Sequence, residues 1–130
     1  MPPIHTITLN PVIDLIYEVD EFEKGTTFRA REYRLVPAGK GINVANALAT
    51  LGEETHAYVP VGWKDCDLFA DICREKGIHF HACPGRFHTR RHCTILETRT
   101  GTVTHVQTPG QPAPMEAIDE SIQDLTHQIQ

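Results

Sequence analysis

Short runs rich in β-branched residues alternate with helical runs along this chain, and this order constrains the fold more than any other feature. A strand, a helix and a second strand in succession predict right-handed crossovers and a parallel sheet with helices packed on it. The expected strands are residues 4–9, 55–62 and 78–83, and the expected helices are residues 39–52, 67–77 and 112–129. The sequence therefore predicts an α/β fold built on a parallel sheet.

Apolar residues recur at helical spacing in each of the expected helices, which predicts one buried face per helix. Gly52 and Gly77 are placed to end the first two helices, and Pro114 lies near the start of the third. The expected buried faces are Val44, Leu48 and Leu51 in the first helix, Leu68 and Ile72 in the second, and Ile118, Ile122, Leu125 and Ile129 in the third.

Residues 13–36 interrupt the α/β alternation. Residues 13–19 read as a strand, an acidic segment leads into a turn at Gly25, and residues 27–36 alternate apolar and basic side chains. This pattern predicts a small antiparallel excursion with one solvated face. A second hairpin is expected where residues 91–98 and 102–108 flank a turn.

The composition limits the classes of protein to consider. The length of 130 residues suits one domain, and the net charge of −5 argues against nucleic-acid binding, which needs a basic surface. The chain starts without a basic segment followed by an apolar run, and it contains no apolar run long enough to cross a membrane. Its four cysteines include no C-x-x-C pair, so we expect free thiols and a cytoplasmic location.

The segment Gly39-Lys40-Gly41 stands at the start of the first expected helix, and Asn43 lies in its first turn. A helix start offers unsatisfied N–H groups and a partial positive charge, and glycines allow close approach to the backbone. Lys40 adds a full charge, and Asn43 offers a donor and an acceptor. The segment matches neither a Walker A loop nor G-x-G-x-x-G, so by itself it is consistent with either an anion site or a flexible loop.

A longer set of spaced motifs resembles the PfkB family of ribokinase-like sugar kinases. The residues that carry the resemblance are Gly39, Gly41, Asn43, Ala45, Gly52 and Gly62, together with TLNPVID at residues 8–14, Thr89-Arg90, and Thr108-Pro109-Gly110. The opening motif resembles that of the phosphohexose branch, which includes 1-phosphofructokinase and tagatose-6-phosphate kinase. The resemblance implies a three-layer α/β/α fold with a parallel sheet core and a small antiparallel β lid at about residues 13–36.

The resemblance also implies roles for individual residues. Asp14 and Asn43 would bind sugar hydroxyls, and Gly39 and Gly41 would admit the sugar close to the backbone. From the sequence alone, Asp14 equally suits a turn or a cap after Asn10-Pro11.

Arg90 would hold the phosphate of the substrate, which suits a planar guanidinium, and Lys40 would assist it. Without the family context, Arg90 reads as a solvated charge at the start of a strand. Two positions depart from the family pattern. Ala38 replaces a frequent glycine, and His92 replaces a frequent asparagine; the second change affects the choice of sugar.

The lid of this family often forms a dimer interface, so the resemblance implies a homodimer. Phe28, Tyr33 and Leu35 then need not face the core of their own chain. Arg29 has the alternatives of reaching a neighbouring subunit and of lying solvated on a strand face.

The family's Gly-Ala-Gly-Asp motif has no match, since no Gly-Asp dipeptide occurs in the sequence. In the family this motif supplies the catalytic base and an anion hole, and the nucleotide site lies in the same half. We therefore expect no catalytic residue in this chain, and ATP and magnesium are implied only by the family. The expectation is the N-terminal, sugar-phosphate-binding part of a phosphohexose kinase, inactive alone, with the C-terminal half of the fold absent.

Fructose 1-phosphate is the first substrate expected, with tagatose 6-phosphate and fructose 6-phosphate as alternatives. A non-catalytic sugar-phosphate-binding module is a further alternative that uses the same residues. A metal site is a weaker reading of the histidines and cysteines crowded between residues 79 and 93, because their spacing fits no standard zinc pattern. These residues are His79, His81, Cys83, His88, His92 and Cys93. We expect them to lie along strand faces without a metal.

Overall fold

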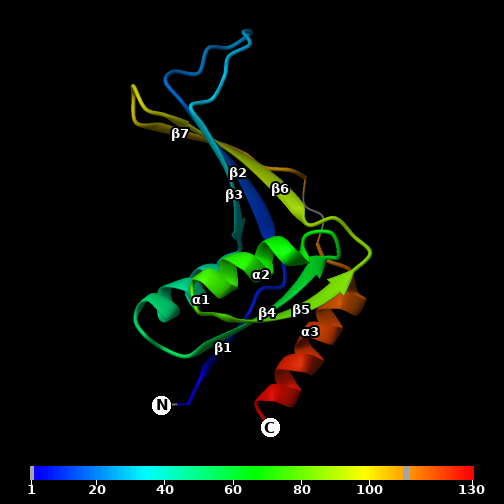
Figure 1. The fold of residues 1–130 in the computed structure, drawn as a ribbon. Coiled ribbons are helices and arrows are strands. Elements are labelled where there is room, and N and C mark those ends of the chain that lie inside the picture. Colours follow the sequence, from blue (N-terminus) through cyan, green and yellow to red (C-terminus); the bar gives the residue numbers. More distant parts are fainter. Residues whose placement is uncertain (1, 110–111) are drawn as a thin grey trace.

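The computed structural model describes residues 2–109 and 112–130, and Figure 1 shows its strands and helices. The strands are β1 (Ile4–Ile7), β2 (Val12–Val19), β3 (Glu32–Ala38), β4 (Thr55–Gly62), β5 (His79–Gly85), β6 (Arg90–Glu97) and β7 (Thr102–Val106). The helices are α1 (Lys40–Thr50), α2 (Cys66–Glu75) and α3 (Met115–Gln128).

A parallel sheet in the order β1-β4-β5 forms the centre of the molecule. Helices α1 and α2 pack on one of its faces and α3 packs on the other, so the chain has three layers (Figure 1). This arrangement confirms the predicted α/β fold with a parallel core. Within the described residues, none of the helices is long and apolar enough to span a membrane.

A second sheet extends from one end of the parallel sheet, in the order β3-β2-β6-β7 (Figure 1). The β2–β3 and β6–β7 pairs are antiparallel, as expected for two hairpins, but β2 and β6 run parallel to each other. The lid is therefore wider than residues 13–36, because the second hairpin completes it. Residues 21–31 lie outside strands, so β3 begins later than the alternation predicts.

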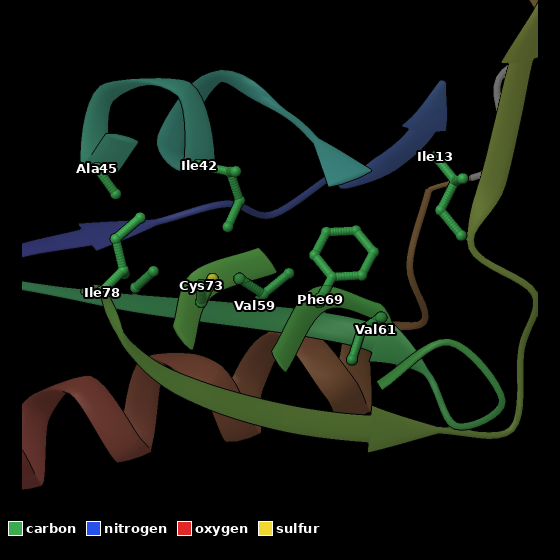
Figure 2. Packing of buried hydrophobic residues seen from close by; sticks show 9 residues of the cluster. Ile13, Ile42, Ala45, Val59, Val61, Phe69, Cys73 and Ile78 are labelled. Atoms are coloured by element: carbon green, nitrogen blue, oxygen red, sulfur yellow. The ribbon is translucent and has the colours of Figure 1, made fainter. Parts of the chain in front are cut away.

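The main hydrophobic core lies between the parallel sheet and helices α1 and α2. Figure 2 shows its side chains on one side of the sheet, with α3 on the other. The core consists of Ile13, Ile42, Ala45, Ala57, Val59, Val61, Phe69, Cys73 and Ile78. Ile13 belongs to β2, so the base of the lid is anchored in the core of the α/β layer. This anchoring fixes the position of the lid relative to the carboxyl end of β1.

The predicted buried faces of the helices were wrong in detail. In α1, Val44 and Leu51 are 52% and 78% exposed, whereas Ile42 and Ala45 are buried. The buried face of α3 also differs from the predicted one, since Ile122 is exposed and Ser121 is buried. In α2 the buried residues are Phe69 and Cys73, and the predicted Leu68 and Ile72 are only partly buried beside them. Small side chains let α1 and α3 approach the sheet closely, which rotates the larger residues away from it.

Candidate functional site

The candidate site lies where the carboxyl end of β1 meets the start of α1. Residues 8–11 connect β1 to β2, and β6 begins beside them with Arg90. Gly39 is the N-cap residue of α1, and no side chain caps the first amides of this helix. The first turn of α1 therefore presents N–H groups and a partial positive charge at this point.

Gly39 and Gly41 pack against the protein itself. A Cβ on Gly39 would lie 2.5 Å from Cγ2 of Thr8, and a Cβ on Gly41 would collide with Oγ1 of Thr8 and the carbonyl of Ile7. Gly39 also has a φ of +143°, which a side chain disfavours. Both glycines are thus required for close contact between α1 and β1, a reason that the sequence reasoning did not give. This packing accounts for both glycines without a bound sugar.

Arg90 joins the start of β6 to the connection between β1 and β2. Its Nη2 donates to the carbonyl oxygen of Asn10 at 3.0 Å, and its Nε donates to that of Pro11 at 3.3 Å. It is half-buried, so it is not the fully solvated charge of the alternative reading. A guanidinium carries five N–H groups, so these two bonds leave capacity for an anion.

A cavity of about 320 Å³ brings several of the expected residues together. Its lining consists of Ile7, Thr8, Leu9, Asn10, Lys40, Gly41 and Arg90. The lining includes two cationic side chains and no carboxylate. This charge balance, next to a helix start, suits an anion.

Thr8 is a lining residue that the sequence reasoning missed. It is 3% exposed, and within the described part of the chain its hydroxyl oxygen has no hydrogen-bond partner. A buried hydroxyl without a partner is costly. The hydroxyl oxygen is closed off from solvent, so a direct bond to a ligand in the cavity would require a local movement. The signal available in the sequence was a threonine near the carboxyl end of the first expected strand.

Asp14 lies within β2, so its reading as a turn or cap residue was wrong. Its Oδ1 accepts a hydrogen bond from the hydroxyl of Thr94 at 2.7 Å. The same hydroxyl lies 2.9 Å from Nδ1 of His105. Asp14 does not line the cavity, but it pairs across the strands with His92.

His92 connects Asp14 to the cavity. Its Nε2 lies 3.5 Å from Nη1 of Arg90. Burial and the neighbouring guanidinium of Arg90 lower the pKa of His92, and Asp14 only partly opposes this. A neutral His92 can accept a hydrogen bond from Arg90, so the position that departs from the family pattern supports the guanidinium.

Asn43 is exposed in the first turn of α1 and does not line the cavity. Its backbone N–H donates to the carbonyl oxygen of Gly39 at 2.8 Å. The structure therefore gathers Lys40, Gly41 and Arg90 around one cavity and leaves Asp14, Gly39 and Asn43 outside its lining.

Two other hollows bear on the choice of site. One, of about 650 Å³, is lined by Trp63, Lys64 and residues 84–88. Another is lined by residues 88–91 with Thr108 and Pro109. The described part of the motif Thr108-Pro109-Gly110 therefore lies beside Arg90. Gly110 of the same motif lies outside the described residues.

The lining of the larger hollow includes no residue from the first turn of a helix, whereas that of the smaller cavity includes Lys40 and Gly41 of α1. The smaller cavity is therefore our candidate site.

Solved structures of sugar kinases share this architecture. Phosphofructokinase-2 from Escherichia coli in complex with fructose-6-phosphate matches with a TM-score of 0.86 at 22% identity, over 98% of this chain and 42% of that chain. A carbohydrate kinase from Agrobacterium tumefaciens matches with a TM-score of 0.68 at 22% identity, over 83% of this chain and 36% of that chain. The chain thus has a ribokinase-like α/β fold, of which it forms a part.

Sequence comparison gives the family. The model of the pfkB family carbohydrate kinases matches residues 7–128, and the chain belongs to this family. A 1-phosphofructokinase from Xanthomonas campestris pv. campestris is 36% identical over 107 residues, which cover 81% of this chain and 33% of that protein. The ATP-dependent 6-phosphofructokinase isozyme 2 of Mycobacterium tuberculosis is 29% identical over 124 residues, 95% of this chain and 37% of that protein. The chain therefore spans between 33% and 37% of the length of these two relatives.

Proposed function

We propose that this chain is the N-terminal, sugar-phosphate-binding part of an ATP-dependent phosphohexose kinase. The reaction would convert fructose 1-phosphate to fructose 1,6-bisphosphate. The observation that carries the proposal is the cavity at the start of α1, where the two cationic side chains of Lys40 and Arg90 meet and no carboxylate lines the wall. The 1-phosphofructokinase relatives support the choice of sugar phosphate.

The phosphate of the substrate would occupy this cavity. The guanidinium of Arg90 is already oriented by two backbone carbonyls, so it loses little freedom when it binds an anion. Lys40 is exposed and adds a mobile charge, and the first amides of α1 donate from a fixed position. Such preorganised donors favour a doubly charged phosphate over a neutral sugar.

Asp14 and Asn43 would bind the hydroxyls of the sugar. The hydroxyl of Thr94 occupies Oδ1 of Asp14, which orients the carboxylate and leaves Oδ2 as an acceptor. Asn43 extends from the first turn of α1 with a donor and an acceptor. In phosphoryl transfer the reacting hydroxyl must be held in line with the donor phosphate, and this positioning is the contribution of these residues.

The described residues do not fit a magnesium–nucleotide complex at this cavity. Mg²⁺ prefers carboxylate, phosphate and water oxygens, whereas Lys40 and Arg90 line the cavity and no carboxylate does. ATP and magnesium therefore belong to another part of the kinase in this proposal. The chain by itself would bind the sugar phosphate and transfer no phosphoryl group.

Isothermal titration calorimetry with fructose 1-phosphate tests the proposal. Lys40→Gln and Arg90→Gln are each expected to weaken binding about 10- to 100-fold, since a hydrogen bond to a charged group contributes about 1.5–3 kcal/mol. Arg99→Gln is the matched control, because Arg99 is exposed and pairs with Glu21 in the lid. Equal affinity for fructose and fructose 1-phosphate, or no heat at all, would contradict a phosphate site in this cavity.

A non-catalytic sugar-phosphate-binding module is the second candidate, because the cations that line the cavity, Lys40 and Arg90, would serve it equally. Coding sequence that continues in frame to a Gly-Ala-Gly-Asp motif would identify a kinase, whereas a stop codon after Gln130 would favour the module. Titrations with tagatose 6-phosphate and fructose 6-phosphate decide between the sugars.

The proposal also includes the oligomeric state of the protein and its location in the cell. A homodimer through the lid is consistent with the exposure of Phe28, Tyr33 and Leu35, and Arg29 is exposed in the same region. Sedimentation of the wild type and of Tyr33→Lys tests it, and a monomer in both would contradict it. A cytoplasmic location is consistent with four free cysteines.

A further inference from the structure

A row of histidines crosses the parallel sheet on the face that α3 covers. In the strand register, His5 of β1 pairs with His56 of β4, and His56 pairs with His79 of β5. The rings of His56 and His79 are stacked with their centroids 4.5 Å apart, and His81 stacks on His56 at 5.1 Å. This row lies near the amino ends of β4 and β5, whereas the sugar-phosphate cavity lies at the carboxyl end of β1.

Glu54 precedes β4 and approaches two of these rings. Its Oε1 lies 3.5 Å from Nε2 of His56 and 3.9 Å from Nε2 of His79. One ligand atom from each of these residues lies within 4.8 Å of the other two. In the described part of the chain, this is the group of histidine, cysteine and acidic side chains that comes close enough to share an ion. Of the histidines and cysteines crowded at residues 79–93, it includes only His79.

The other ring nitrogen of His56 has a partner. Its Nδ1 lies 2.8 Å from Nε2 of His81, and Nδ1 of His81 faces Oδ2 of Asp124 on α3 at 3.9 Å. The result is a row of groups from Glu54 through both imidazoles to Asp124.

Two neutral imidazoles carry two N–H groups, and the bond between His56 and His81 uses one of them. The carboxylates of Glu54 and Asp124 face the two remaining ring nitrogens at 3.5 and 3.9 Å, which is too long for hydrogen bonds. Only one of these nitrogens can carry the second hydrogen, so one carboxylate oxygen faces a nitrogen lone pair. A cation between Glu54 and His56 removes the conflict, because His56 Nδ1–H then donates to His81 and His81 Nδ1–H faces Asp124.

We propose that Glu54, His56 and His79 form a binding site for a divalent transition metal ion, and that Zn²⁺ fits it best. One donor atom from each of the three side chains lies within 4.8 Å of the other two, and the exposed ring of His79 must turn out of its stack on His56 for both nitrogens to face one ion. Two imidazoles and a carboxylate are a zinc donor set that leaves a fourth position open. The row of imidazole and carboxylate behind His56 supplies the outer hydrogen bonds that hold a metal-binding histidine in one tautomer.

The spacing of the donors supports a tetrahedral ion. Bonds of about 2.0–2.1 Å in a tetrahedron place ligand atoms roughly 3.4 Å apart. The separation between Glu54 and His56 is already 3.5 Å, and that between Glu54 and His79 must close from 3.9 Å by rotation of exposed side chains. The side chains of Glu54 and His79 are each 58% exposed, so an ion can enter from solvent, whereas that of His56 is 16% exposed and fixed by the strand.

Zinc binding by the purified chain, after treatment with a chelator, tests this site. We expect one Zn²⁺ per chain by elemental analysis after equilibration. Glu54→Gln and His79→Gln should each lower the affinity about 100-fold or more, and His81→Phe should lower it about 10- to 100-fold through loss of the outer hydrogen bond. His88→Gln is the control, since His88 is exposed in the loop that precedes β6. Because the side chains of Glu54 and His79 are exposed, the two substitutions should leave the chain folded. A loss of zinc affinity in these variants therefore reports on the site itself.

Cobalt substitution gives an independent readout. Ligation by His56, His79 and Glu54 predicts visible d–d bands without a thiolate charge-transfer band, which separates this site from the four free cysteines. Zinc binding that is unchanged in Glu54→Gln and His79→Gln, a thiolate band, or the absence of binding at micromolar zinc would each overturn the proposal. Sugar-phosphate titrations are a separate experiment, so either proposal can fail without the other.

Discussion

Replacing Gly41 by alanine tests whether α1 approaches β1 as closely as the structure shows. The added Cβ meets Oγ1 of Thr8 and the carbonyl group of Ile7, and the backbone of Ile7 is held in the parallel sheet. Overpacking against atoms that cannot move costs about 3 kcal/mol, at the upper end of its usual range. The helix propensity of alanine returns at most about 1 kcal/mol. The net loss of stability is therefore about 2 kcal/mol.

Thermal unfolding by circular dichroism measures this loss. For a chain of this size, about 2 kcal/mol lowers Tm by roughly 6–10 °C. Ala47→Gly is the control, because Ala47 is exposed in α1 and should lose only about 0.5–1 kcal/mol. If Gly41→Ala is as stable as the wild type, the close contact between α1 and β1 does not exist. The cavity beside this contact would then have a different shape as well.

Further predictions concern the lid, the pH dependence and the helix faces. Thr94→Val removes a buried hydroxyl that donates to Asp14, and it should cost about 1–2 kcal/mol in urea unfolding. Burial and the neighbouring guanidinium lower the pKa of His92, so the unfolded chain binds more protons than the folded chain between that lowered value and about 6.5. Stability should therefore fall as the pH drops through this window, and less so in His92→Gln, as urea titrations at about pH 7.5 and about pH 5 would measure. Leu51→Lys should change the free energy of unfolding by less than about 0.5 kcal/mol, because Leu51 is 78% exposed. Ala45→Leu should cost about 1–3 kcal/mol, because Ala45 is fully buried, and the reverse order of these two effects would restore the original assignment of the buried face.

The order and type of the helices and strands were predictable from local sequence pattern. The face that each helix turns toward the sheet was not. Val44, Leu48 and Leu51 have the correct spacing for a buried face, but so do Ile42, Ala45 and Ala49, which pack on the sheet. Periodicity cannot choose between two such faces. The choice is made by the close contact of Gly41 with β1, and this contact depends on a partner that is distant in the sequence.

In the candidate site, the two cationic side chains could be predicted from the sequence, whereas the hydrogen bonds around them could not. Lys40 and Arg90 are found together because family motifs place them on either side of one cavity. The role of Thr94 beside Asp14 depends on β2 and β6 pairing in parallel, although 80 residues separate the two side chains. The histidine row likewise depends on strand register, and spacing along the chain gave no sign that His56 would lie between Glu54 and His81.

Amide chemical-shift mapping by NMR with fructose 1-phosphate tests the central claim most directly. The account predicts the largest shifts at Thr8 and at the first turn of α1, including Lys40 and Gly41, with a further shift of the side-chain Nε–H of Arg90. Shifts centred on Trp63 and residues 84–88, or shifts equally large with unphosphorylated fructose, would contradict a phosphate site at the start of α1.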